Sequence, residues 1–341
     1  MTRSYHSRRK KEQLFRKMAW LLPGIVVVCI FVALAGRFLD NQEVYSNSDF
    51  TSGKLPNTID IDGVIYRQKT RVKTYLFMGI DERSVKSADN EAEYVGTGQC
   101  DVLELVVVDQ NANTYAVLPI NRDTITAVKS LEDDGTYIAT SDVQIALAHA
   151  NGDGGEMSCE NTVDAVSNLL NGQRIDGYAA LYMDSIGVIN RLAGGITVPI
   201  EDDFSQADPT LKIGSTVTLT DEQAELYVRR RMDVGDGTNE GRMRRQSVYL
   251  NELKRVFEQK FSEDESQVKK VYESLEDYMV TNLTGKDCSK LAKAMLKNKS
   301  LGELQIEGTV SLDELGYRQF IPDEDSLMQT VLLLFYDVVT T

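Results

Sequence analysis

Arginine is concentrated in one stretch of this chain, residues 219–250, which reads LTDEQAELYVRRRMDVGDGTNEGRMRRQSVYL. A guanidinium group is a planar fork of five donors that binds phosphate or carboxylate oxygens in pairs. Several such groups on one side of the molecule would form an oxyanion site. The competing interpretation is a solvated helix face, and the pattern alone leaves both open. The arginines concerned are Arg229, Arg230, Arg231, Arg242, Arg244 and Arg245.

The second group of arginines falls on a predicted helix that begins at Gly241. Arg242, Arg245 and Gln246 stand at positions i, i+3 and i+4, which share one face. Arg244 lies off that face, so we expect it to be solvated. These three residues are therefore the candidates from this helix for an anion site.

The first group of arginines follows a predicted helix that begins at Thr220, because Thr220 and Gln223 have the spacing of a capping box. Residues two apart on a helix point in opposite directions, so Arg229 and Arg231 share a side only if the chain becomes extended there. The glycine-rich loop 233–240 would let the two arginine groups converge.

Acidic residues follow or open three predicted strands. Asp81 follows the apolar run 75–80, Asp101 opens a predicted hairpin, and Asp123 follows it, next to Arg122. Ligands collect at strand ends in α/β sheets, so we expect these side chains to be neighbours. Their oxygens suit Mg²⁺, or Mn²⁺ in its place. Carboxylates, a divalent ion and arginines together indicate phosphoryl transfer. Each aspartate taken singly is also a common turn residue.

The elements that must position these residues alternate between strand and helix. This alternation predicts an α/β fold with a central, mostly mixed β-sheet flanked by helices. We expect strands at 75–80, 101–109, 114–120, 177–183 and 196–200, and helices at 162–170, 184–194, 220–228, 241–261, 263–277 and 323–336.

The N-terminal region has a different composition. Residues 18–36 carry no charge and are long enough to cross a bilayer as a helix. Basic residues precede them, so the positive-inside rule places the N-terminus in the cytoplasm. We therefore predict a basic cytoplasmic tail at 1–17, a transmembrane signal-anchor at 18–37, a linker at 38–72 and an extracellular domain at 73–341. A cleaved signal peptide remains an alternative.

Charge, cysteine and histidine narrow the possible functions. The first 37 residues contribute +7 to a formal net charge of −15, so the remainder carries −22. A body this acidic is poorly suited to nucleic acid, and the short cytoplasmic tail cannot hold a DNA-reading fold. The chain has four cysteines and two histidines, without a zinc or redox spacing. Disulfides Cys100–Cys159 and Cys159–Cys288 both remain open.

From Tyr75 to about Leu334 the chain resembles the LytR-CpsA-Psr family. The resemblance rests on MGIDER, PINRDT, IDGYAALYMDSIGVINRLAGGITVPI and, most specifically, YVRRRMDVGDGTNEGRMRRQ. It implies a membrane-anchored phosphotransferase that moves an anionic glycopolymer, of the wall teichoic acid or capsule type, from a polyprenyl-pyrophosphate carrier onto peptidoglycan.

The resemblance also implies roles for individual residues. Asp81 and Asp101 would bind Mg²⁺, and the general base would be Asp123 or Asp101. Arg122, Arg229 and Arg231 would hold the pyrophosphate, with Arg242, Arg245 and Gln246 completing or supporting that pocket.

Two positions depart from the family pattern. Gln99 stands where the family usually has arginine, and Gln144-Ile145-Ala146 replaces a Lys-Ile-Asn sequence. Gln99 cannot supply a permanent positive charge. This substitution favours the alternative function, a non-catalytic membrane-tethered binder of lipid-linked or anionic glycans.

Overall fold

The computed structural model describes residues 55–82, 98–132, 134–237, 239–264 and 267–339. The predicted cytoplasmic tail and signal-anchor, and the predicted linker up to residue 54, lie outside these residues. Among the residues that are described, no helix is both long enough and apolar enough to cross a membrane. The anchor therefore stays a prediction.

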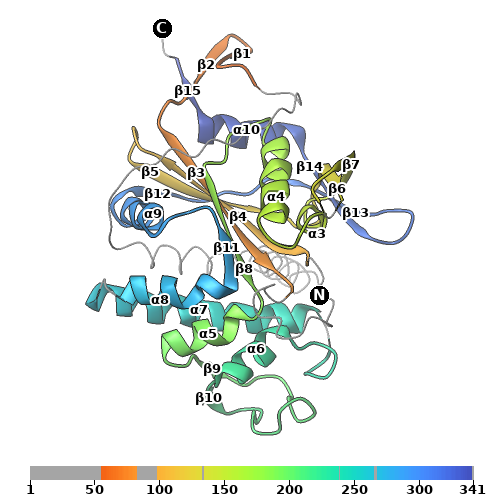
Figure 1. Ribbon diagram of the computed structural model, residues 1–341, viewed down its shortest axis with the longest axis vertical. Coiled ribbons are helices and arrows are strands. Elements are labelled where there is room, and N and C mark those ends of the chain that lie inside the picture. The colour runs from red at the N-terminus through yellow and green to blue at the C-terminus, as the bar shows by residue number, and fades with distance from the viewer. Residues whose placement is uncertain (1–54, 83–97, 133, 238, 265–266, 340–341) are drawn as a thin grey trace, which may run out of the picture.

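Within the described residues, the centre of the molecule is a mixed six-stranded sheet in the order β11-β8-β3-β4-β5-β12 (Figure 1). Strand β3 pairs antiparallel with β4 and parallel with β8, and β4 pairs antiparallel with β5. The α/β fold with a central mixed sheet is confirmed. The strands are β3 (Val72–Ile80), β4 (Cys100–Asp109), β5 (Thr114–Ile120), β8 (Gly177–Tyr182), β11 (Met279–Thr281) and β12 (Lys299–Glu303).

Side chains of β4 show why this sheet is central. Leu103, Leu105 and Val107 enter one hydrophobic cluster, whereas Val106 and Val108 enter another on the opposite face. Successive side chains of a strand point to opposite faces, so a near-continuous apolar run is buried only between two layers. The sheet therefore lies between two helical layers.

The first helical layer contains the predicted arginine helices (Figure 1). It packs on the face of β4 that carries Val106 and Val108. The second layer packs on the face that carries Leu103 and Leu105. The first layer comprises α5 (Ser185–Ala193), α6 (Asp221–Arg229), α7 (Asn239–Glu263), α8 (Gln267–Leu275) and α9 (Gly285–Lys297), and the second α3 (Leu147–Ala150), α4 (Glu156–Leu169) and α10 (Glu324–Phe335).

Smaller sheets surround the core. Strands β1 (Thr58–Ile61) and β2 (Val64–Gln68) form a sheet with the C-terminal β15 (Tyr336–Val338), so part of the predicted linker is folded onto the domain. Two antiparallel hairpins were not expected from the sequence. They are β6 (Ile125–Leu131) with β7 (Tyr137–Gln144), and β13 (Gly308–Leu312) with β14 (Arg318–Pro322). Strands β9 (Thr197–Pro199) and β10 (Thr216–Thr218) pair beneath α6.

The cysteines of the described region are reduced. Cys100, Cys159 and Cys288 are buried free thiols. Neither disulfide that the sequence left open is therefore formed.

Candidate functional site

The antiparallel order of β3, β4 and β5 brings the end of β3, the start of β4 and the end of β5 to one edge of the sheet. Asp81 follows β3, and its backbone N–H donates to the carbonyl of Gln99 at 3.1 Å. The Gln99 N–H donates in return to Oδ1 of Asp81 at 2.6 Å. Asp81 is thereby fixed beside the first residues of β4, which include Asp101. We call this group, with Arg122 and Asp123, the carboxylate edge.

Arg122 lies at the centre of the carboxylate edge, with its side chain 29% exposed. Its Nη1 donates to Oδ1 of Asp101. Its Nη2 donates to the side-chain oxygen of Gln99 at 2.5 Å, and its Nε lies 3.7 Å from Oδ1 of Asp123. Gln99 therefore accepts a hydrogen bond that orients Arg122, a role that an arginine at position 99 could not take because it has no acceptor.

Asp123 is the most enclosed acid of this edge. Gln144 donates from Nε2 to Asp123 Oδ1 at 3.3 Å, and Nε of Arg318 lies 3.7 Å from Oδ2. Burial raises the pKa of Asp123, while the charges of Arg122 and Arg318 act in the opposite direction. Arg318 reaches the site because the Phe320 N–H donates to the carbonyl of Asp123 at 2.8 Å, which ties β14 to the loop after β5.

The residues of this edge fit the Mg²⁺ that the family resemblance implies. Asp81 and Asp101 are two carboxylates on adjacent strands, and Mg²⁺ commonly takes one or two carboxylates with water and phosphate completing its shell. Among the described residues, no group of three or more His, Cys, Asp or Glu side chains forms a metal site. Two carboxylates suit an ion whose remaining ligands are water and phosphate.

The arginines of the 219–250 stretch occupy the connection between α6 and α7, which we call the arginine hinge. Helix α6 begins with the predicted capping box of Thr220 and Gln223 and ends at Arg229. Arg230 is extended, with φ −62° and ψ 139°, as convergence of Arg229 and Arg231 requires. The loop then turns through Gly235 (φ 59°) and Gly237 (φ 67°), in the left-handed region that favours glycine.

Not all hinge arginines face the same surroundings. Arg229 pairs with Glu225 at 2.5 Å, and Arg230 pairs with Asp233 at 3.2 Å. Arg231 is exposed. Both ion pairs are local to the end of α6 and its loop.

The charge of Arg242 is affected by arginines of both the hinge and the carboxylate edge. Its side chain is partly buried, and the pKa of its guanidinium is lowered first by burial and then by the charges of Arg231, Arg122 and Arg245. Because burial and the charges of other arginines both disfavour the charged form of Arg242, a bound anion nearby would favour it. The convergence of these arginines on one anion stays a prediction.

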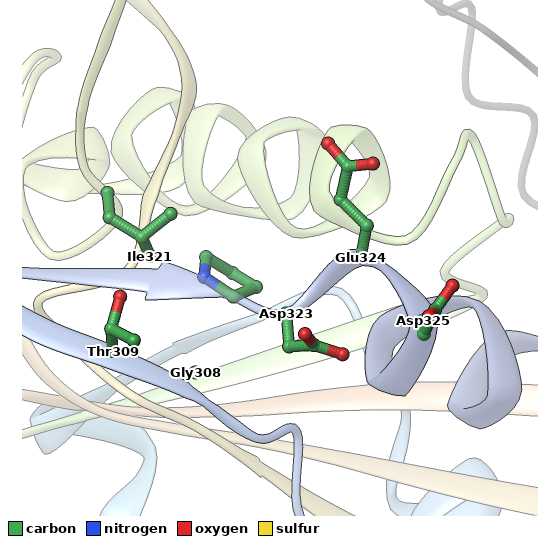
Figure 2. Close-up of a pocket in the computed structure, with 7 residues that line it drawn as sticks. Gly308, Thr309, Ile321, Asp323, Glu324 and Asp325 are labelled. Atoms are coloured by element: carbon green, nitrogen blue, oxygen red, sulfur yellow. The ribbon is translucent and has the colours of Figure 1, made fainter.

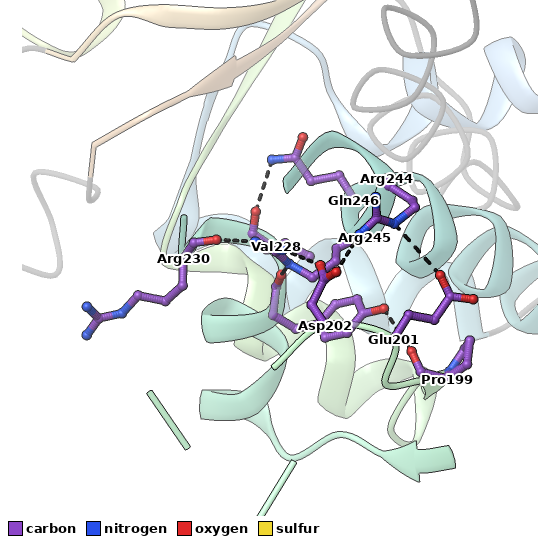
Figure 3. A network of polar contacts seen from close by, with 9 residues as sticks. Pro199, Glu201, Asp202, Val228, Arg230, Arg244, Arg245 and Gln246 are labelled. Carbon is purple, nitrogen blue, oxygen red and sulfur yellow. Dashed lines mark hydrogen bonds and ion pairs between the residues drawn. The ribbon is translucent and has the colours of Figure 1, made fainter. Parts of the chain in front are cut away.

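Arg245 and Gln246 point into the protein (Figure 3). Arg245, 4% exposed, donates from Nε to the carbonyl of Tyr227 at 3.0 Å and from Nη1 to Asp202 at 2.6 Å. Its Nη2 donates to the carbonyl of Arg230. Gln246 donates to the carbonyl of Val228 at 3.0 Å. Both side chains therefore hold the end of α6, and their predicted role in a pyrophosphate pocket stays a prediction.

Arg244 is partly solvated, with its side chain 39% exposed, but it also forms ion pairs that the sequence did not predict. Its Nη2 donates to Asp202 Oδ1, and its Nε lies 3.7 Å from Glu201. The helix spacing was read correctly, but the loop after β9 brings acidic residues to this side of α7. Asp202 and Arg318 were not predicted from the sequence. Each contacts its partner in a distant segment of the chain, and no local sequence pattern indicates such a contact.

A hollow on the described surface lies away from the predicted site residues. It is formed where the β13–β14 hairpin meets the start of α10 (Figure 2). None of the predicted site residues lines it, and its carboxylates disfavour an anionic ligand. Its lining residues are Gly308, Thr309, Ile321, Pro322, Asp323, Glu324 and Asp325.

Comparison with known proteins places this geometry in context. Residues 39–333 match the model of the LytR_cpsA_psr family. A search of curated proteins finds no match. Among solved structures, TagV from Bacillus subtilis is similar at 24% identity and a TM-score of 0.50, covering 78% of this chain and 96% of that one. Protein gbs0355 from Streptococcus agalactiae is similar at 20% identity and a TM-score of 0.55, covering 79% and 90%. At these identities the structural likeness supports the fold.

Proposed function

The chain belongs to the LytR_cpsA_psr family, and we propose its function from that membership and from the geometry of its charged residues. The family comprises transferases of cell-wall glycopolymers. We propose that this member transfers an anionic glycopolymer, of the wall teichoic acid or capsule type, from a polyprenyl-pyrophosphate carrier to peptidoglycan.

The observation that carries the proposal is the arginine cluster beside the carboxylate edge. Burial, and after it the charges of Arg231 and Arg122, lower the pKa of Arg242, and Arg122 also contacts Asp101. Positive charges that lie near one another repel, and a pyrophosphate bound between them would offset that repulsion. Arg122, Arg231 and Arg242 are therefore the proposed carrier ligands, with Arg229 beside them at the end of α6.

The reaction needs a nucleophile, a base and a stabilised leaving group. A hydroxyl oxygen of the acceptor sugar attacks the phosphorus that bears the glycopolymer, and a new P–O bond forms. The bond to the bridging oxygen of the pyrophosphate breaks, so the carrier leaves as prenyl phosphate with that electron pair. The hydroxyl proton passes to Asp123 or Asp101. The arginines stabilise the charge that develops on the leaving phosphate.

Asp81 and Asp101 are the proposed ligands of Mg²⁺, or of Mn²⁺ in its place. A bound divalent ion would neutralise phosphate charge and polarise the phosphoryl oxygens. The chain's own contribution is positional, because hydrogen bonds between Asp81 and Gln99, and between Arg122 and Gln99, fix these side chains in advance.

The proposal includes an extracellular location. The apolar segment 18–37 would anchor the protein in the cell membrane, with the N-terminus in the cytoplasm and the folded domain outside. The lipid-linked donor and the peptidoglycan acceptor would then both be within reach of the domain.

The test is a transfer assay with the full-length protein, a synthetic polyprenyl-pyrophosphate-linked saccharide and peptidoglycan fragments. We expect release of polyprenyl phosphate that requires a divalent ion and is lost in Asp101→Asn and Arg122→Gln. Arg255→Gln serves as the matched control, since Arg255 lies on the exposed side of α7 and pairs with Glu252.

Two other results would count against transfer. Tight binding of the donor without release, with the acceptor present, would identify the protein as a membrane-tethered glycan binder and point to Gln99 as the departure responsible. Full activity in Asp101→Asn and in Arg122→Gln would reject the assignment of this site.

A further inference from the structure

We infer that Asp202 is a positioning residue for the arginine hinge, and that it acts through Arg245 on the residues proposed to bind the carrier pyrophosphate. The inference rests on the proposed function for the identity of the ligand. Asp202 lies in the loop after β9, and none of the sequence motifs includes it in the site.

Asp202 is a nearly enclosed carboxylate, 10% exposed, between two arginines of α7. Its Oδ2 accepts a hydrogen bond from Arg245 Nη1 at 2.6 Å, and its Oδ1 accepts one from Arg244 Nη2. A buried guanidinium such as that of Arg245 is tolerated only when a counter-charge and hydrogen bonds replace water. Asp202 supplies that counter-charge.

Arg245 in turn holds the end of α6. It donates to the carbonyls of Tyr227 and Arg230, while Gln246 donates to the carbonyl between them, that of Val228. The last carbonyls of a helix have no intrahelical partner, so side chains that bind them decide where and in which direction the chain leaves. Here the chain leaves in the extended conformation at Arg230, which sets the direction of Arg231 relative to Arg229 at the end of α6.

The loop of the hinge packs against the same segment, Asp202 and its neighbour Asp203. The Gly235 N–H donates to the carbonyl of Asp203 at 2.9 Å. A Cβ added to Gly235 would lie 3.0 Å from Cγ of Asp202, and its φ of 59° is one that side chains rarely adopt. Asp202 therefore contacts the hinge loop as well as Arg244 and Arg245, and connects the helices on both sides of the hinge.

The two possible roles of Asp202, positioning and simple electrostatics, predict opposite effects on pyrophosphate binding. Asp202 is an anion near a proposed anion site, so removing its charge should strengthen pyrophosphate binding if only the field mattered. If Asp202 positions the hinge, removing its charge should weaken binding, because Arg245 loses its partner and the carbonyls of Tyr227 and Arg230 lose their fixed donor. The sign of the change separates the two accounts.

The experiment compares full-length wild type, Asp202→Asn and Glu201→Gln. Glu201 is the matched control, because Glu201→Gln removes the same charge one residue away from Asp202, at a side chain that is itself 62% exposed. The probe is geranylgeranyl pyrophosphate, whose affinity is measured by calorimetry. Amide hydrogen exchange of residues 227–235 reports on the hinge without any ligand.

We expect Asp202→Asn to bind the probe at least tenfold more weakly and to exchange faster at 227–235, with Glu201→Gln unchanged or slightly tighter. Affinity equal to or above that of wild type in Asp202→Asn would overturn the inference. If wild type itself binds no probe, the proposed function fails separately. Amide hydrogen exchange at residues 227–235 then tests the positioning role by itself. Unchanged exchange in Asp202→Asn would overturn that role.

If Asp202→Asn does not fold, Asp202→Glu takes its place. It keeps the charge but adds a methylene where Gly235 leaves little room, so we expect the same loosening of the hinge. Wild-type affinity and wild-type exchange in this variant would overturn the inference.

Discussion

Arg242 and Arg245 stand three residues apart on one face of α7, yet the fold treats them differently. Arg245 is 4% exposed and donates to Asp202 and to two backbone carbonyls. Arg242 is partly buried among like charges, with its pKa lowered by burial and by Arg231, Arg122 and Arg245. The charge of Arg245 is thus compensated by Asp202, whereas the charge of Arg242 is disfavoured by burial and by three other arginines.

The comparison shows what a motif can and cannot assign. Spacing places both arginines on the inner face of the helix, and residue type gives both the same chemistry. Their roles separate only through partners from other segments. For Arg245 these are Asp202 and the end of α6, and for Arg242 they are Arg122 and Arg231. Variants at the two positions should therefore fail in different ways.

The largest effect on activity is expected at Arg242. Arg242→Gln should lower transfer about 10²–10³-fold, since one donor to developing phosphate charge is removed. Its melting temperature should not fall by more than about 2 °C, because repulsion within the arginine cluster is relieved. Transfer kinetics and differential scanning calorimetry measure both, with Arg255→Gln as control. A large loss of stability with normal kinetics would mean that Arg242 is a structural residue.

Substitution of Arg245 should lower stability more than activity, the opposite of the result expected at Arg242. Arg245→Met leaves Asp202 nearly buried with Arg244 as its remaining partner, and breaking a buried pair costs about 3–5 kcal/mol. A fall in melting temperature on the order of 10 °C follows for a domain of this size. Activity measured well below the melting temperature should fall less than in Arg242→Gln. If the melting temperature is unchanged, the buried network does not hold the hinge.

The smallest effect is expected at Arg318. Its charge lowers the pKa of Asp123, against the effect of burial. If Asp123 is the base, activity is lost as pH falls through its pKa, and Arg318→Ala should move this acidic limb toward higher pH. Above that limb, activity should change less than about tenfold, because the Arg318 side chain is half exposed and Arg122 remains beside Asp123. An unmoved limb in the pH–rate profile would assign the base to Asp101 instead.

Local signals in the sequence were sufficient for the main sheet and for α6. The apolar run 75–80 and the hairpin 101–120 predicted β3, β4 and β5 because buried strands require such runs. The capping box at Thr220 is formed as expected. The hairpins β6–β7 and β13–β14 were not predicted, since exposed side chains on their strands give no clear alternation. Tyr137, Val310 and Leu312 are all more than half exposed.

The candidate site was predictable to the extent that strand order determines it. Asp81, Asp101 and Arg122 meet because β3, β4 and β5 are consecutive antiparallel strands. Asp202 and Arg318 were not predictable, because α7 and the loop after Asp123 reach them only in the folded chain. Charged residues in surface loops give no sequence signal of the partner that they will meet.

The central claim is that the cluster around Arg242 is a pyrophosphate site. Thermal unfolding of the full-length protein with increasing geranylgeranyl pyrophosphate tests it most directly, since a ligand that binds only the folded state raises the melting temperature. At about a hundredfold excess over Kd the gain is about 2.7 kcal/mol. We predict this rise in wild type and Arg255→Gln, and its loss in Arg242→Gln. An equal rise in Arg242→Gln would contradict the claim.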